Sequence, residues 1–110
     1  MTELVFRAEH PAAPGLEVRV NFGVFAGRNA TQAEIDDLAR ALHEEVESFA
    51  ILAEERHEFG GEVEAAVRQI VIEIPEERDG LELRVLQIAD SWATECIQSR
   101  SDLGELGSEL

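Results

Sequence analysis

The sequence predicts an α+β fold, namely a two-layer sandwich in which a mostly antiparallel four-stranded sheet carries two helices on one face, in the order ββαββα. Three patterns lead to this prediction: alternation of apolar residues over 16–24, two alternating segments on either side of Gly60-Gly61, and two apolar stripes with helical spacing. A chain of 110 residues has room for one core. We therefore expect a single domain over 1–100 and a flexible acidic tail over 101–110.

Two strands are expected in the first part of the chain. Residues 3–8 alternate weakly and are followed by a loop that contains two prolines. From residue 16 to residue 24, every second residue is apolar and most of the residues between are polar or glycine, which is typical of a strand with one buried face. The first helix is then expected to begin at Thr31, because Thr31 and Glu34 have the spacing of a capping box. Its apolar residues are Ile35, Leu38, Ala39, Leu42 and Val46.

A β-hairpin is expected next, with strands over residues 48–59 and 62–74. Two glycines between alternating segments favour a type I′ turn, which needs positive φ at both central residues. Matching of aliphatic residues across the two strands favours one register. This register pairs Phe59 with Glu62, Phe49 with Ile72, Ile51 with Ile70, and His57 with Glu64.

The last helix is expected to follow Pro75. Asp79 and Glu82 have the spacing of a second capping box, and a wide apolar stripe comes after them. The stripe includes Leu81, Val85, Ile88, Trp92 and Cys96. The alternative is a further strand over residues 81–86, with the helix starting near Asp90.

The hairpin is apolar on both faces. On the face opposite Phe49 and Ile51, the alternation places Ala50, Leu52, Val63, Ala65, Val67 and Val71. Such a patch is more apolar than a surface that only contacts water, and it is typical of an interface. We therefore expect a homodimer or a higher oligomer, with Leu52, Val63, Val67 and Val71 at the interface.

The net charge of the chain is −15, from 24 acidic residues and nine arginines, with no lysine. This charge repels phosphate backbones and anionic lipids, so neither nucleic acid nor membrane is an expected partner. The acidity has three possible origins: solubility in a concentrated or salty cytoplasm, a coding sequence rich in G and C, or mimicry of nucleic acid towards a basic partner. Cys96 is the only cysteine, which excludes an internal disulfide and a zinc site built on several thiolates. With no secretory pattern and no long apolar run, we expect a cytoplasmic protein.

Two places carry candidate chemistry. His57 with Glu55 and Glu64 has the residue types of a general acid and base pair, and His57 with Glu64 those of a partial metal site. The alternative is a solvated hairpin end with opposite charges facing each other, and we expect no metal. Arg28, just before a helix start, is the best position for a small anion, although the loop also reads as a simple flexible connection.

No motif in the chain predicts a reaction, so we expect a non-catalytic protein without a cofactor. In this interpretation the acidic cytoplasmic domain self-associates through its sheet and binds a protein partner or a small ligand. One alternative is a small oligomeric enzyme or metal-binding protein that uses His57, Glu55 and Glu64. Another is an acidic inhibitor that occupies the groove of a basic partner.

Overall fold

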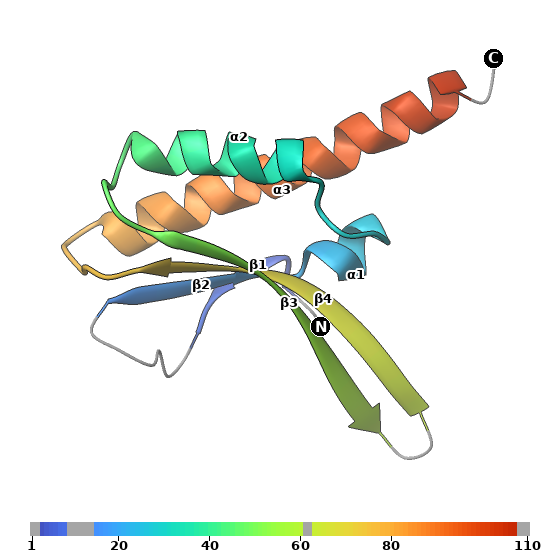
Figure 1. Cartoon of the computed structure of the whole chain (residues 1–110), viewed down its shortest axis with the longest axis horizontal. Coiled ribbons are helices and arrows are strands. Elements are labelled where there is room, and N and C mark those ends of the chain that lie inside the picture. Colours follow the sequence, from blue (N-terminus) through green and yellow to red (C-terminus); the bar gives the residue numbers. More distant parts are fainter. Residues whose placement is uncertain (1–2, 9–14, 61–62, 108–110) are drawn as a thin grey trace.

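Figure 1 shows a computed structural model of the chain, which describes residues 3–8, 15–60 and 63–107. In these residues four strands form one antiparallel sheet in the order β1-β2-β4-β3, and the helices lie on one side of it. The elements are β1 (Val5–Arg7), β2 (Leu16–Val20), α1 (Phe22–Ala26), α2 (Gln32–His43), β3 (Ala50–Gly60), β4 (Val63–Ile74) and α3 (Leu81–Gly107). The predicted α+β fold class is confirmed, and a short helix, α1, is added to the two that were expected.

The core lies between the sheet and the helices. Alternate residues of β2 and β4 face the helices in matched pairs, such as Val18 with Ile72. The helices contribute buried residues from the predicted stripes, among them Leu38 and Leu42 of α2 and Val85 of α3. Full burial of one such aliphatic side chain stabilises the fold by about 1.5–3 kcal/mol, so this layer is the main source of stability.

The second strand is shorter than its alternation predicts. β2 ends at Val20, and the predicted continuation to Val24 is wrong, since Phe22–Ala26 forms α1. A side chain at Gly23 would place its Cβ 2.6 Å from the Cβ of Arg68, so the chain passes close to β4 here and needs a glycine. Gly27 ends α1 in the left-handed region with φ of 71°, which suits glycine. As a result Phe22 is buried and Val24 is exposed.

The predicted register of the hairpin is wrong by two residues. Gly60 pairs with Val63, so Ile51 faces Ile72, Ala53 faces Ile70 and His57 faces Ala66. Because strand side chains alternate with a period of two, a shift of two residues leaves every residue on its predicted face. The residues between Gly60 and Val63 lie outside the described part of the chain, and with them the predicted turn type.

The two long helices begin where the sequence predicts. The Glu34 N–H donates to Thr31 Oγ1 (3.2 Å) and the Thr31 N–H donates to Glu34 Oε1 (2.8 Å), which confirms the first capping box. Helix α3 starts at Leu81, so the alternative strand over residues 81–86 is wrong. The helix continues to Gly107, past the start of the predicted tail at residue 101. Among the described helices, none has the length and apolar character needed to cross a membrane.

Two parts of the molecule extend beyond the core. In Figure 1 the far end of the β3–β4 hairpin and the far end of α3 point away from the body of the protein. β4 is bonded to β2 only from Ile70 to Ile74, so its earlier residues pair with β3 alone. β3 is an edge strand over its whole length.

Candidate functional site

The face of the sheet opposite the helices, called here the outer face, is crossed by the side chain of Arg19. Its Nη1 donates to Glu54 Oε1 (2.9 Å) and to Gln69 Oε1 (3.1 Å). Arg19 belongs to β2 and Glu54 to β3, so the side chain must pass over β4, which lies between these strands. The outer face is therefore partly covered by the chain itself, with a charged group that brings together three strands.

This crossing changes the predicted interface. Val71, which pairs with both Arg19 and Leu52, is only 2% exposed, so it is not available to a partner as the sequence predicted. Leu52 is 45% exposed and remains accessible on the same face. The side chains of Val63 and Val67 lie outside the part that the structure describes.

A buried polar pair lies beside Arg19. Gln69 is 1% exposed and its Nε2 donates to Asn21 Oδ1. Asn21 Nδ2 in turn donates to the carbonyl oxygen of Glu3 (2.5 Å). Burying amides is costly unless they are hydrogen-bonded, and here each finds a partner. The pair thus fixes the end of β2 against β4.

A pocket of about 300 Å³ lies where α1 and the loop after it meet the hairpin, and we call it the hairpin pocket. Its lining residues are Phe22, Gly23, Asn29, Ala30, Ala53, Glu54, Glu55, Arg68, Gln69 and Ile70. Phe22 and Ile70 are buried, whereas Ala53, Glu55 and Arg68 are exposed. Glu55 and Arg68 are directly paired across β3 and β4. The pocket therefore combines an apolar floor with a charged rim.

The predicted cluster around His57 is only partly assembled. His57 Nε2 lies 3.9 Å from Glu55 Oε1, and both side chains are about half exposed, at 52% and 50%. Glu64 pairs with Phe59, so its predicted pairing with His57 is wrong, and its side chain lies outside the described part. Among the side chains that the structure describes, no group of three or more histidine, cysteine or acidic residues is placed to hold a metal ion. An imidazole and a carboxylate that are this exposed lack the shielding that general acid-base catalysis normally uses.

Arg28, the predicted anion site, is bound to a carboxylate of the same chain. Its two Nη atoms donate to the two oxygens of Glu34, each at 2.7 Å. The guanidinium also lies over the ring of Phe22, 5.3 Å from the centroid. Hydrogen bonds from Arg28, then from the Thr31 amide and hydroxyl, lower the pKa of Glu34 to about 2. The positive charge of Arg28 is thus already neutralised, and the arrangement joins the α1–α2 loop to the start of α2.

Trp92 and Cys96 of α3 complete this arrangement, which we call the junction cluster (Phe22, Arg28, Glu34, Trp92 and Cys96). Trp92 Nε1 donates to the backbone oxygen of Glu34 (2.7 Å), and its ring lies 5.3 Å from that of Phe22. Burial, together with the charge of Glu34, raises the pKa of Cys96 to about 12, so its thiol stays protonated at neutral pH. A protonated thiol is a poor nucleophile, which agrees with a structural role.

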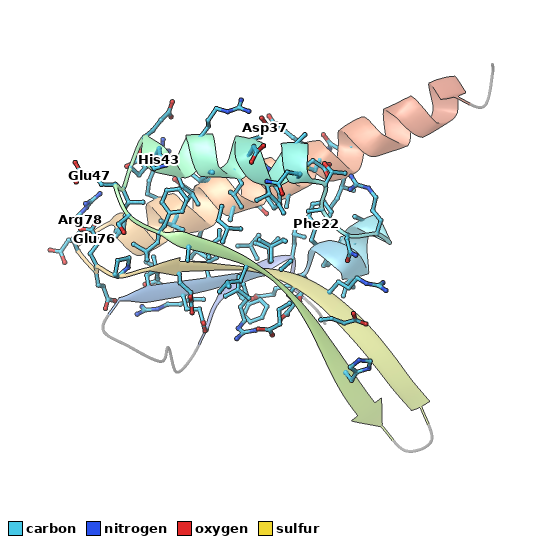
Figure 2. The ribbon with its side chains drawn as sticks, in the orientation of Figure 1. Phe22, Asp37, His43, Glu47, Glu76 and Arg78 are labelled. Carbon is cyan, nitrogen blue, oxygen red and sulfur yellow. The ribbon has the colours of Figure 1, made fainter. Side chains whose placement is uncertain are left out.

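The sequence contains part of the signal for the junction cluster. The capping box identifies Thr31 and Glu34, but the partnership of Glu34 with Arg28 crosses a loop and follows no periodic pattern. No pattern in the sequence predicts the hairpin pocket. The pocket depends on α1, and the alternation of apolar residues over 16–24 predicts a strand where α1 forms. Figure 2 shows Phe22 on the side of the core where α1 meets the long helices.

Comparison with known proteins adds no functional information. No protein-family model matches the chain, and neither a curated protein nor a solved structure is significantly similar to it.

Proposed function

We propose that this chain is a non-catalytic binding protein that contacts a protein partner through β3. The observation that supports this is the contrast between two directly paired residues. Val71 of β4 is 2% exposed, whereas Leu52 of β3 is 45% exposed. A leucine half open to water on an eleven-residue edge strand is a surface suited to contact with another chain.

The state of the reactive groups supports a non-catalytic role. Cys96 stays protonated, Glu34 is bound by Arg28, and the His57 side chain is 52% exposed, 3.9 Å from Glu55. Each arrangement is explained by structure or solvation, and none brings a nucleophile and a base together in a shielded site. The single cysteine and the acidic surface fit a role in the cytoplasm.

Self-association is the second candidate, because Ala50 and Leu52 are exposed side by side on the outer face of β3. A homodimer across this face would cover both residues. The net charge of −15 on each copy opposes such a dimer, and salt that screens this charge favours it. A twofold dimer is therefore expected to strengthen as the salt concentration rises, whereas contact with a basic partner weakens.

The proposal is tested with two leucine variants. Leu52 of β3 and Leu83 of α3 are both exposed leucines, at 45% and 63%. The wild type, Leu52→Lys and Leu83→Lys are used to capture partners from the lysate of the source cells. We expect a partner that the wild type and Leu83→Lys retain and that Leu52→Lys loses. A partner that is lost equally with both variants, or with neither, contradicts the proposed role of β3.

Light scattering of the same three proteins tests self-association. A dimer of the wild type that Leu52→Lys converts to a monomer supports the second candidate. A monomer at high micromolar concentration in both low and high salt eliminates it.

A further inference from the structure

β3 has the features of a strand to which a further strand is added. It is eleven residues long, and it lies at the edge of the sheet. The backbone hydrogen bonds that the structure describes outside the helices and strands include none to residues 50–60. One side of β3 therefore carries a row of N–H and C=O groups for which the described backbone supplies no partner, the arrangement that an added strand satisfies.

The opposite edge of the sheet is different. β1 has three residues, and Arg7 in it donates to Glu77 (2.8 Å) and to Glu82 of α3 (2.8 Å). Short length and charged side chains on the edge strand are devices that prevent pairing with another chain. Of the two outermost strands of the sheet, β3 is the long one, and it contains no proline.

The hairpin pocket lies next to this edge. Three consecutive residues of β3, Ala53 to Glu55, line it, and Ala53 carries only a methyl group and is exposed. Side chains of directly opposed residues in neighbouring strands lie about 4.5–5.5 Å apart. A long side chain of an added strand, placed beside Ala53, therefore passes over that methyl group towards Glu55 and the apolar floor at Ile70.

Charge determines which strand fits. Residues 44–58, which lead into β3 and form most of it, contain six glutamates and one arginine. Arg84 binds Glu45, and Arg19 binds Glu54. The other described glutamates here are accessible: Glu44 and Glu47 are exposed, and the Glu55 side chain is 50% exposed. The residues that line the hairpin pocket carry two carboxylates and one guanidinium, from Arg68. A strand with basic side chains is attracted here.

A second copy of this chain is disfavoured at the same edge. Antiparallel pairing of β3 with β3 would bring together two strands that each contain Glu54, Glu55 and Glu58. Like charges opposite each other in a sheet are destabilising, and both copies carry a net charge of −15. The acidic residues thus disfavour a second copy and favour a partner of opposite charge.

We propose that β3 binds an extended segment with alternating basic residues, which pairs as a fifth strand and places one long basic side chain in the hairpin pocket. This rests on the proposed function and adds the chemistry of the partner and its mode of binding. The backbone bonds of the added strand supply affinity, while Glu55 and the pocket supply specificity.

Synthetic peptides provide the test. The probe is a ten-residue peptide of alternating lysine and threonine, and binding is followed by calorimetry and by the amide shifts of the labelled protein. We expect shifts centred on residues 50–58 and an affinity that falls as salt is added. An alternating glutamate and threonine peptide, and an N-methylated form of the lysine peptide, are expected to bind at least about tenfold more weakly.

A fourth peptide tests the pocket. Replacing each lysine by diaminobutyric acid keeps most of the positive charge at pH 7 and shortens the side chain, so affinity should fall about tenfold if a long side chain enters the pocket. Equal binding of the short and long peptides overturns the pocket contact. Equal binding of the N-methylated peptide overturns strand addition.

Two protein variants give the matched control. Glu55→Arg reverses a charge at the pocket, and Glu95→Arg makes the same change at an exposed position of α3. We expect Glu55→Arg to weaken binding at least about tenfold and Glu95→Arg less than about threefold. If both variants weaken binding equally, the attraction is general and the proposed site is wrong. A dimer that forms without peptide and protects the β3 amides from exchange would also contradict the proposal.

One result separates this inference from the proposed function. If capture from lysate depends on Leu52 but the lysine peptide does not bind β3, the proposed function stands and this inference fails.

Discussion

The two strands of the long hairpin are similar in length, at eleven and twelve residues, but they have different surroundings. Over residues 69–72, every residue of β4 is at most 3% exposed, because β2 and the helices cover it. The residues of β3 that pair with Ile70 and Val71 are Ala53 and Leu52, and both are exposed. Position in the sheet therefore helps to separate a strand that stabilises the fold from a strand that is available to a partner.

The largest effect is expected from a cavity in β4. Ile72 is fully buried between Val18 of β2 and Ile51 of β3. We expect Ile72→Ala to lower the free energy of unfolding by about 2–5 kcal/mol, since it loses apolar contacts and leaves a cavity. Urea unfolding followed by circular dichroism measures this change. A loss below about 1 kcal/mol would show that β4 is not the central strand of a packed core.

The next largest effect concerns the junction cluster, which joins α1, the start of α2 and α3. Glu34→Gln keeps a residue that suits a capping box and removes the ion pair with Arg28. We expect it to lower the free energy of unfolding at pH 7 by about 1.5–3 kcal/mol, the range for hydrogen bonds to charged groups. Asp37→Asn is the control, because the Asp37 and Arg40 side chains are 60% and 76% exposed, and it should change stability by less than about 0.5 kcal/mol.

The same pair predicts how stability depends on pH. The pKa of Glu34 is lowered from 4.5 to about 2 in the folded state, first by Arg28. A carboxyl group whose pKa is lower in the folded state stabilises the fold at pH values above its unfolded-state pKa. This contribution is lost as the pH falls from about 4.5 towards 2. Wild type should therefore lose more stability than Glu34→Gln over this interval. Parallel pH profiles of the two proteins would contradict the pairing.

How far the sequence predicts this molecule depends on the kind of pattern. Burial follows the spacing of apolar residues along the chain. The helical stripes with Leu38 and Val85 and the strand face with Val18 were therefore predictable. Register was not, because a shift by two residues moves Ile51 from Ile70 to Ile72 without changing any face.

Local alternation also failed where backbone contact decides the structure. The pattern over residues 16–24 favours one long strand, but Gly23 packs against Arg68 and Gly27 turns the chain, so a helix replaces its end. The hairpin pocket and the capture of Arg28 by Glu34 both follow from this turn. The candidate site was therefore less predictable than the core, since it is formed by contacts between segments distant in the sequence.

A smaller effect is expected at Trp92. Trp92→Phe retains an aromatic ring against Phe22 and removes the Nε1–H that donates to the Glu34 backbone oxygen. We expect a loss of about 1–2 kcal/mol, from the hydrogen bond and the smaller ring. Because Trp92 is the only tryptophan, the variant has no tryptophan fluorescence, so denaturation is followed by circular dichroism. No loss at all would show that the indole does not hold α3 to the start of α2.

The smallest effect is expected on β3, where the contrast between the strands becomes decisive. Leu52→Lys replaces a side chain that is 45% exposed on the outer face, whereas its cross-strand partner Val71 is 2% exposed. Substitutions at such exposed positions usually change stability by no more than about 0.5 kcal/mol. Urea unfolding of this variant beside Ile72→Ala measures the difference between the strands directly. A loss from Leu52→Lys close to that from Ile72→Ala would mean that β3 belongs to the stabilising core, and its exposed leucine would then no longer support a binding role.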